Sequence, residues 1–331
     1  MIAYSRRQFV GNATATALLA GLSTPGWAQE QMLDSLTILT GFPPGGTSDI
    51  LCRRVAEALR GNYARNAYVE NRTGAGGQIA VNAMKSMPAD GSAVLQTPST
   101  MLSIYPHTYS NLPYKPQEDL TPVSLACTFV FGYAVGSAVP ASITTIDEYV
   151  KWINENPKYA NFGSPGAGAS PHFIGAVLAR DTGVDLQHIA FRGTQPAIQD
   201  AIGGHLGAVC GPLGEFLPHL SDKRLRLLAT TGEARSKFTP DVPTFLEQGL
   251  KNLTIGEWYG FFFPAGASRA TVDRLNAAMR KALAEQAVID GLALSGMEAA
   301  SSTPEELAEL LQRDTEFWAP VVQSIGFTAD S

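Results

Sequence analysis

Cysteine, charge and long apolar runs are all scarce in this chain of 331 residues. Charged side chains make up 16% of it, whereas an average soluble protein has about 25%. Lysine and arginine nowhere form a run, and the formal net charge is −6, so a nucleic-acid-binding groove is not expected. No apolar stretch approaches the roughly 20 residues that a membrane-spanning helix needs. The hydrophobic fraction of 45% is that of a globular protein.

The three cysteines are Cys52, Cys127 and Cys210, so at least one thiol has no intramolecular partner. Their separations along the chain, 75 and 83 residues, match no metal-binding or redox motif. All three lie in apolar surroundings, which favours buried structural thiols over reactive ones.

Motifs for catalysis, metals and nucleotides are also missing. The five histidines show no ligand spacing, and no Gly-Lys-Ser/Thr sequence forms a phosphate-binding loop. Ser164 does not complete a nucleophile elbow, because Phe162 stands where that motif has glycine. Ile79 and Pro171 each replace the last glycine of a dinucleotide-binding pattern. We therefore expect no catalytic residue, metal or cofactor, and the chain is predicted not to be an enzyme.

The first 28 residues are typical of an export signal. Residues 5–10 (SRRQFV) resemble the twin-arginine signal, and a mildly apolar segment follows at 11–22. Small residues before the expected cleavage near Ala28 complete the pattern, and no cysteine follows as a lipid anchor. Cleavage there leaves 22 basic and 30 acidic residues, a charge of −8. The mature protein is predicted to be free in the periplasm.

The mature sequence alternates apolar runs with helical patterns. Strands are expected at 36–40, 67–70 and 94–97, with a helix from Thr47 between the first two. This rhythm predicts parallel strands joined by right-handed crossovers. Near the C-terminus, Thr303 begins a helix as the N-cap of a capping box.

The same rhythm returns later in the chain, with strands expected at 159–162, 188–191, 206–209 and 225–230 and an aromatic-rich one at 258–263. It indicates an α/β protein of two lobes, with the C-terminal helices returning to the first. Apolar stretches at 129–135 and 253–260 are the predicted crossings. We assign 29–132 plus 258–331 to lobe 1 and 133–257 to lobe 2.

Three glycine-rich loops, at 41–49, 71–77 and 163–170, each follow a strand and open a helix. Such junctions expose backbone N–H groups and the positive end of a helix dipole, so they suit anions. Because ligands bind beyond the carboxyl ends of strands in open α/β sheets, the loops predict a cleft for a carboxylate.

Six segments of the chain resemble the signatures of the Bug family of periplasmic solute receptors, the binding components of tripartite tricarboxylate transporters. The resemblance runs in order over about 36–325, and the segments are 42–49 (FPPGGTSD), 70–77 (ENRTGAGG), 161–166 (NFGSPG), 191–197 (FRGTQPA), 240–244 (PDVPT) and 258–260 (WYG).

The resemblance implies a type II periplasmic-binding-protein fold whose two lobes close on a small organic carboxylate. It also implies binding mainly through backbone N–H groups and delivery to a membrane permease of the tripartite tricarboxylate type. No nucleic acid is an expected partner, and we expect a monomer. The candidate ligand-binding residues are Phe42, Pro43, Gly45, Gly46, Asp49, Gly74, Gly76, Gly77, Ser99, Ser164, Gly168, Ser170, Arg192 and Thr194.

Several roles stay open at this point. Asp49 either caps its helix or contacts ligand, and Arg192 either holds a ligand carboxylate or forms a structural ion pair. Many family members carry aspartate after the strand at Leu206, whereas this chain has 209–212 (VCGP), so the ligand's identity is not carried over. The alternatives are a periplasmic hydrolase that uses Ser164 with His172, and a structural periplasmic protein.

Overall fold

The computed structural model describes residues 32–329; the predicted signal peptide lies outside this range. Its strands are β1 (Leu33–Thr40), β2 (Ala64–Asn71), β3 (Ala93–Pro98), β4 (Leu120–Val135), β5 (Asn161–Ser164), β6 (Gln187–Ala190), β7 (Ala208–Pro212), β8 (Arg226–Thr230), β9 (Gly256–Pro264) and β10 (Glu298–Ala299).

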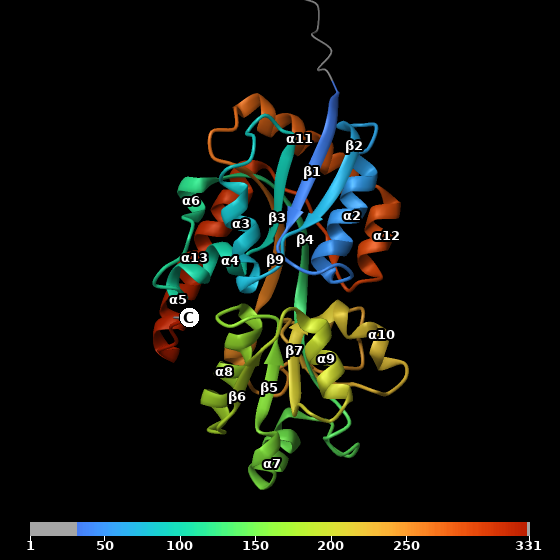
Figure 1. Ribbon diagram of the computed structural model, residues 1–331. Helices are drawn as coiled ribbons and strands as arrows, with labels where there is room; N and C mark the ends of the chain where they lie inside the picture. Colours follow the sequence, from blue (N-terminus) through green and yellow to red (C-terminus); the bar gives the residue numbers. More distant parts are fainter. Residues whose placement is uncertain (1–31, 330–331) are drawn as a thin grey trace, which may run out of the picture. The chain divides into compact units, whose positions relative to one another are not determined.

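The helices pack on these strands and fill the connections between them (Figure 1). They are α2 (Thr47–Leu59), α3 (Gln78–Met84), α4 (Thr100–Ser103), α5 (Tyr105–Thr108), α6 (Pro116–Asp119), α7 (Ile146–Glu155), α8 (Ser170–Thr182), α9 (Thr194–Ile202), α10 (Leu217–Leu220), α11 (Arg269–Leu283), α12 (Gln286–Ala293) and α13 (Pro304–Ile325), with short 3₁₀ turns η1 (Ala75–Gly77), η2 (Pro157–Tyr159), η3 (Leu213–Glu215) and η4 (Lys251–Leu253).

Two parallel-stranded halves share a pair of long antiparallel strands. β1 pairs in parallel with β2 and β3 in the first half, and β5 pairs in parallel with β6 and β7 in the second. β4 pairs with β9 over its first part and with β7 and β8 over its last part. Figure 1 shows β4 and β9 continuing from the upper half toward the lower one. The predicted parallel βαβ units are therefore confirmed, and the chain is mixed α/β.

The predicted crossings coincide with β4 and β9. The expected lobe limits at 132/133 and 257/258 fall inside these two strands, and they stay a prediction. The helices α11, α12 and α13 pack on β4 and on α2, α4 and α5 of the first half. The last of them begins with the expected capping box between Thr303 and Glu306.

Two strands lie about two residues later in the chain than the sequence predicts, whereas β1 and β2 begin earlier than predicted. The strand expected at 159–162 begins only at Asn161, because Pro157 opens the 3₁₀ turn η2. The strand expected at 206–209 runs later, from Ala208 to Pro212. Both strands thereby reach further toward the carboxyl-end loops that follow them.

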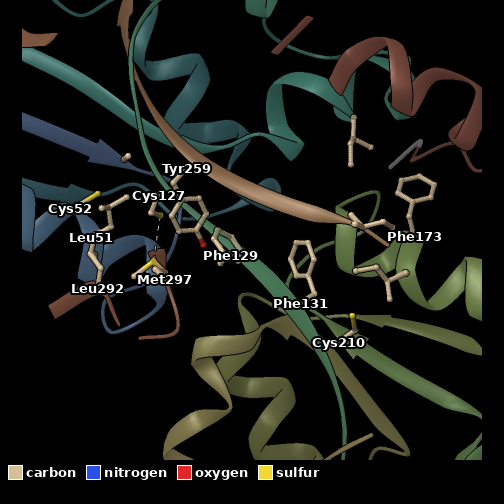
Figure 2. Packing of buried hydrophobic residues seen from close by; sticks show 14 of the residues in the cluster. Leu51, Cys52, Cys127, Phe129, Phe131, Phe173, Cys210, Tyr259, Leu292 and Met297 are labelled. Carbon is tan, nitrogen blue, oxygen red and sulfur yellow. Dashed lines mark hydrogen bonds between the residues drawn. The ribbon is translucent and has the colours of Figure 1, made fainter. Parts of the chain in front are cut away.

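One large hydrophobic cluster extends through both halves, and Figure 2 shows part of it. Cys52, Cys127 and Cys210 are all free and fully buried, as expected, and burial raises the pKa of each thiol. The Cys127 sulfur lies 3.7 Å from that of Met297 within the cluster. Within residues 32–329, no helix is both long and apolar enough to span a membrane.

Candidate functional site

A cavity of about 270 Å³ lies where the loops of the two halves face each other. Parallel strands of both halves end there, so their carboxyl-end loops converge as open α/β sheets require. Phe129 and Phe131 of β4 and Glu257 and Tyr259 near the start of β9 also line the cavity. The lining residues come from the segments 42–48, 98–105, 129–131, 165–171, 192–196, 212–215 and 257–259, together with Gly76.

The first turn of α2 presents its backbone to this cavity. Gly46 is the N-cap, with an extended backbone (φ −76°), and Thr47 and Ser48 also line the wall. Asp49 stabilises the loop that precedes α2. Its carboxylate accepts hydrogen bonds from the Gly45 N–H at 2.9 Å and from the Asn71 side-chain amide at 2.9 Å.

Asp49 also forms an ion pair of 2.8 Å with Arg53, one turn further along α2. Burial acts to raise the pKa of Asp49, but the hydrogen bonds from Arg53, Gly45 and Asn71 outweigh it and lower the pKa. The residue is 2% exposed and does not line the cavity. The Asp49 carboxylate thus supports the loop before α2, but no side-chain hydrogen bond caps the helix at Gly46, and a role of Asp49 in ligand binding stays a prediction.

A half-buried glutamate, Glu215, faces the N-terminus of α2 from the other half. The Glu215 carboxylate, at the end of η3, accepts a hydrogen bond of 3.1 Å from the side-chain amide of Gln195. Thr47 and Thr194 lie close to it and act to lower its pKa. Burial nevertheless raises the pKa of Glu215 to about 7. The carboxyl lines the cavity and therefore brings titratable charge into it.

A second glutamate, the buried Glu257 of β9, also lines the cavity. Its carboxylate accepts hydrogen bonds from the Ser99 hydroxyl, from the Thr100 hydroxyl at 2.7 Å and from the Ser170 hydroxyl at 2.8 Å. Burial raises its pKa in spite of these donors. Because Ser170 opens α8 in the second half, this carboxylate ties the two halves together.

Aromatic rings supply much of the remaining wall. Phe129 of β4 packs edge-to-face on Tyr259 of β9, with ring centroids 4.6 Å apart, and on Phe131 at 5.7 Å. Figure 2 shows Phe129 and Phe131 following each other along β4, with Tyr259 beside them. The Tyr259 hydroxyl lies 2.8 Å from that of Thr47, so the aromatic wall is joined to the α2 N-terminus.

Six of the residues predicted from the sequence line the cavity, and eight do not. The lining ones are Phe42, Pro43, Gly46, Gly76, Arg192 and Thr194. The others lie outside the wall: Gly45, Asp49, Gly74, Gly77, Ser99, Ser164, Gly168 and Ser170.

Several of the residues outside the wall support it through hydrogen bonds or through their backbone conformation. Ser99 and Ser170 direct their hydroxyls to Glu257 rather than into the cavity. Gly77 adopts a left-handed conformation (φ 96°), and a Cβ there would lie 2.8 Å from the end of Met101. Its neighbour Gly76 has φ 61°, and a Cβ there would lie 2.5 Å from the Tyr105 hydroxyl. These glycines therefore shape the loop that supports the wall.

Sequence reasoning missed both glutamates and the rings of Phe129, Phe131 and Tyr259. Each glutamate stands alone in an apolar segment, 213–217 (LGEFL) or 256–262 (GEWYGFF). A lone acidic residue in such a segment is expected either to be buried with hydrogen-bond partners or to belong to a functional site. The reason is that an unpaired buried charge is strongly destabilising. That signal was available in the sequence.

The serine of the hydrolase alternative lies outside the cavity wall. Ser164 is fully buried, donates to the Gly166 carbonyl at 3.1 Å, and lies 2.7 Å from Nε2 of His188. The expected partner His172 stacks on His188 instead, with ring centroids 3.9 Å apart. Burial lowers the pKa of His172 to about 4 and, together with the charge of His172, that of His188 to about 3. The two rings are therefore neutral packing groups near pH 7.

In the described part of the chain, no group of three or more His, Cys, Asp or Glu side chains is placed to hold a metal ion. The cavity instead offers backbone N–H groups, hydroxyls, two carboxyls and one arginine, Arg192, among its described lining residues. Such a concave, largely apolar pocket with a few polar groups is suited to binding a small molecule.

The fold and the cavity together define a two-lobed periplasmic-binding-protein type of receptor. A family model described as "Tripartite tricarboxylate transporter family receptor" matches residues 51–327. The chain therefore belongs to the tripartite tricarboxylate transporter receptor family, and the Bug-family resemblance is confirmed.

The relatives agree with this membership. The chain is 32% identical over 319 residues to the "UPF0065 protein in tcbD-tcbE intergenic region" of Pseudomonas sp. (strain P51), covering 95% of this chain and 94% of that one. The structure of the periplasmic binding protein BugD has a TM-score of 0.82 at 25% identity, covering 89% and 98% of the two chains. MatC from Rhodopseudomonas palustris with bound malate has a TM-score of 0.79 at 26% identity, covering 87% and 98%.

Proposed function

We propose that this protein is a periplasmic receptor that captures a small organic carboxylate in the cavity and delivers it to a membrane permease of the tripartite tricarboxylate type. The observation that carries the proposal is the cavity between the helix N-termini of α2 and α9, in a member of this receptor family. The solved structure of MatC with bound malate, a small dicarboxylate, supports the ligand class.

The polar groups of the cavity suit a carboxylate at one end. Thr194 and Gln195 open α9 and line the wall, and Arg192 stands just before them. Helix N-termini attract anions, and a guanidinium can hold a carboxylate through two hydrogen bonds. We expect the ligand carboxylate to be bound there, with the aromatic wall around its apolar part.

The two halves contact each other around the cavity, which is the arrangement expected of a closed receptor. A Cβ on Gly193 would lie 3.1 Å from the Pro43 ring, and one on Gly166 would lie 3.7 Å from Gly76. Closure of two lobes over a ligand gives the permease a surface that differs between the loaded and the empty receptor. We infer a monomer that is exported through its twin-arginine-type signal, cleaved near Ala28, and that does not turn over its ligand.

A thermal-shift screen of purified residues 29–331 tests the function. The panel holds aliphatic di- and tricarboxylates, aromatic acids and acidic amino acids, with the neutral amides of the same compounds as controls. A ligand at a hundredfold excess over its Kd stabilises the folded state by about 2.7 kcal/mol. A carboxylate that stabilises the protein while its amide does not supports the receptor function. No stabilisation by any carboxylate, after unfolding and refolding to remove copurified ligand, would refute it.

A further inference from the structure

The charges in the cavity are unusual for the binding site of a simple carboxylate. Two glutamates line it, the half-buried Glu215 and the buried Glu257, and Arg192 is the only cation among its described lining residues. Arg192 is exposed. A dicarboxylate would therefore bring two further negative charges close to two acidic side chains, where the cavity wall limits screening by water.

Both glutamates have only neutral partners within the described chain. Glu215 accepts a hydrogen bond from Gln195. Glu257 accepts from Ser99, Thr100 and Ser170. Hydroxyls and amides replace the lost water but supply no positive charge. Above the pKa of about 7 that Glu215 has, its negative charge is thus left for a bound cation to neutralise.

The two glutamates differ in how many hydrogen bonds their carboxylate oxygens accept. Each oxygen of Glu257 accepts at least two of the hydrogen bonds described, the Thr100 N–H at 3.3 Å being the longest. Oε1 of Glu215 faces the open side of Gly46, where a Cβ would lie 3.6 Å from it. Glu257 is therefore mainly a structural tie, whereas Glu215 is the acid available to a ligand.

From this charge arrangement we propose that the ligand carries a protonated or quaternary nitrogen in addition to its carboxylate, and that Glu215 is the residue that selects it. The inference rests on the receptor function proposed above. The carboxylate is bound at the α9 N-terminus and Arg192, and the nitrogen pairs with Glu215. Phe129, Phe131 and Tyr259 also line the cavity, and aromatic rings can attract positive charge.

Isothermal titration calorimetry at pH 8 tests this with matched ligands on the refolded mature protein. For each chain length from three to eight carbons, the set contains an α-amino acid, an ω-amino acid, its N-trimethylated form, the dicarboxylate and the unsubstituted acid. We expect the tightest nitrogen-bearing ligand to bind at least tenfold more tightly than the dicarboxylate and the unsubstituted acid of equal length.

The variant Glu215→Gln should lose at least tenfold in affinity for that ligand and bind the matched dicarboxylate as tightly as before or more tightly. Glu305→Gln is the control, because Glu305 is exposed on α13. If the wild type prefers a dicarboxylate or an unsubstituted acid, the inference is wrong while the receptor function stands. The ranking of ligand affinities in the wild type tests the inference even if the Glu215→Gln variant does not fold. If no carboxylate binds at all, the proposed function itself fails.

Discussion

The hydroxyl of Ser170 donates a hydrogen bond of 2.8 Å to the carboxylate of Glu257, joining two elements that are 87 residues apart in sequence. Ser170 is the first residue of α8, and Glu257 belongs to β9, which pairs with β3 and β4. The contact is buried and lies directly beside the cavity. A hydrogen bond to a carboxyl group therefore contributes to the contact between the two halves.

Replacing Ser170 by alanine should lower the free energy of unfolding by about 1.5–3 kcal/mol, because a hydrogen bond to a charged group is lost. Urea denaturation followed by circular dichroism measures the change. Ser86→Ala is the matched control, since Ser86 is exposed and its hydroxyl bonds only within its own turn. If both substitutions lower the free energy of unfolding by the same small amount, the hydrogen bond from Ser170 to Glu257 does not contribute to stability.

The stacked pair of His172 and His188 should make the protein lose stability in mild acid. Their folded pKa values, about 4 and about 3, lie below the ordinary value of 6.5. The unfolded chain therefore binds more protons than the folded one, and stability falls as the pH drops from about 6.5 toward 4. At about 1.4 kcal/mol per pKa unit, the two shifts correspond to a loss of about 6 kcal/mol from the pair by pH 4.

Comparing the wild type with His188→Phe isolates this contribution, because the other titrating groups cancel in the difference. The variant should lose less stability than the wild type between pH 7 and pH 4. Identical pH profiles for the two proteins would contradict the neutral, buried state of His188.

Glu215 should make the protein lose stability as the pH rises, which is opposite to the effect of the two histidines. Its folded pKa of about 7 lies above the ordinary 4.5, so the folded protein binds more protons than the unfolded chain between these values. Its contribution to stability is present below pH 4.5 and is lost as the pH rises to 7, by roughly 3 kcal/mol. Glu215→Gln removes this loss. The free energy of unfolding of the variant, relative to that of the wild type, should therefore increase from pH 5 to pH 8 in urea titrations. If this difference does not change with pH, the pKa of Glu215 is not raised.

Gly46→Val should reduce ligand affinity at least tenfold without unfolding the protein. The backbone of Gly46 is in an ordinary region for any residue, and a Cβ would make only normal contacts of 3.6 Å with Glu215 and Pro43. The two further methyl groups would extend into the cavity. Gly256→Val is the control, because a Cβ there meets open space. Calorimetry with a hit from the carboxylate screen is the measurement, and unchanged affinity in Gly46→Val would place the ligand elsewhere.

Changing Arg6 and Arg7 to lysine should leave uncleaved precursor in the cytoplasm, because the twin-arginine pathway requires the arginine pair. Cell fractionation followed by immunoblotting measures the distribution of precursor and mature protein. Normal export of the variant would show that another pathway recognises the signal.

Local patterns predicted the elements of the fold well. The capping box of Thr303 and Glu306 and the parallel units around β1 and β5 follow from short-range periodicity and end signals. The glycine-rich loops also appear where expected, because a chain that turns sharply from strand to helix needs residues with few side-chain restrictions. The six-segment resemblance then identified the family.

The cavity itself was only partly predictable. Glu215 and Glu257 belong to no motif, and they meet the cavity only because β7 and β9 take neighbouring places beside β4. Ser164 pairs with His188 instead of His172 because β5 and β6 are adjacent and place these side chains side by side. Contacts of this kind depend on the order of strands in the sheet.

The sequence by itself determined the class of fold, the export signal we propose and the loops that carry backbone donors, because each depends on residues close together in the chain. Tertiary structure alone decided which side chains line the cavity and which support its wall. In the folded protein Asp49, Ser99 and Ser170 bond to structural partners, and two glutamates reach the cavity. The physical reason is that burial and charge pairing are set by residues distant in sequence, which only packing brings together.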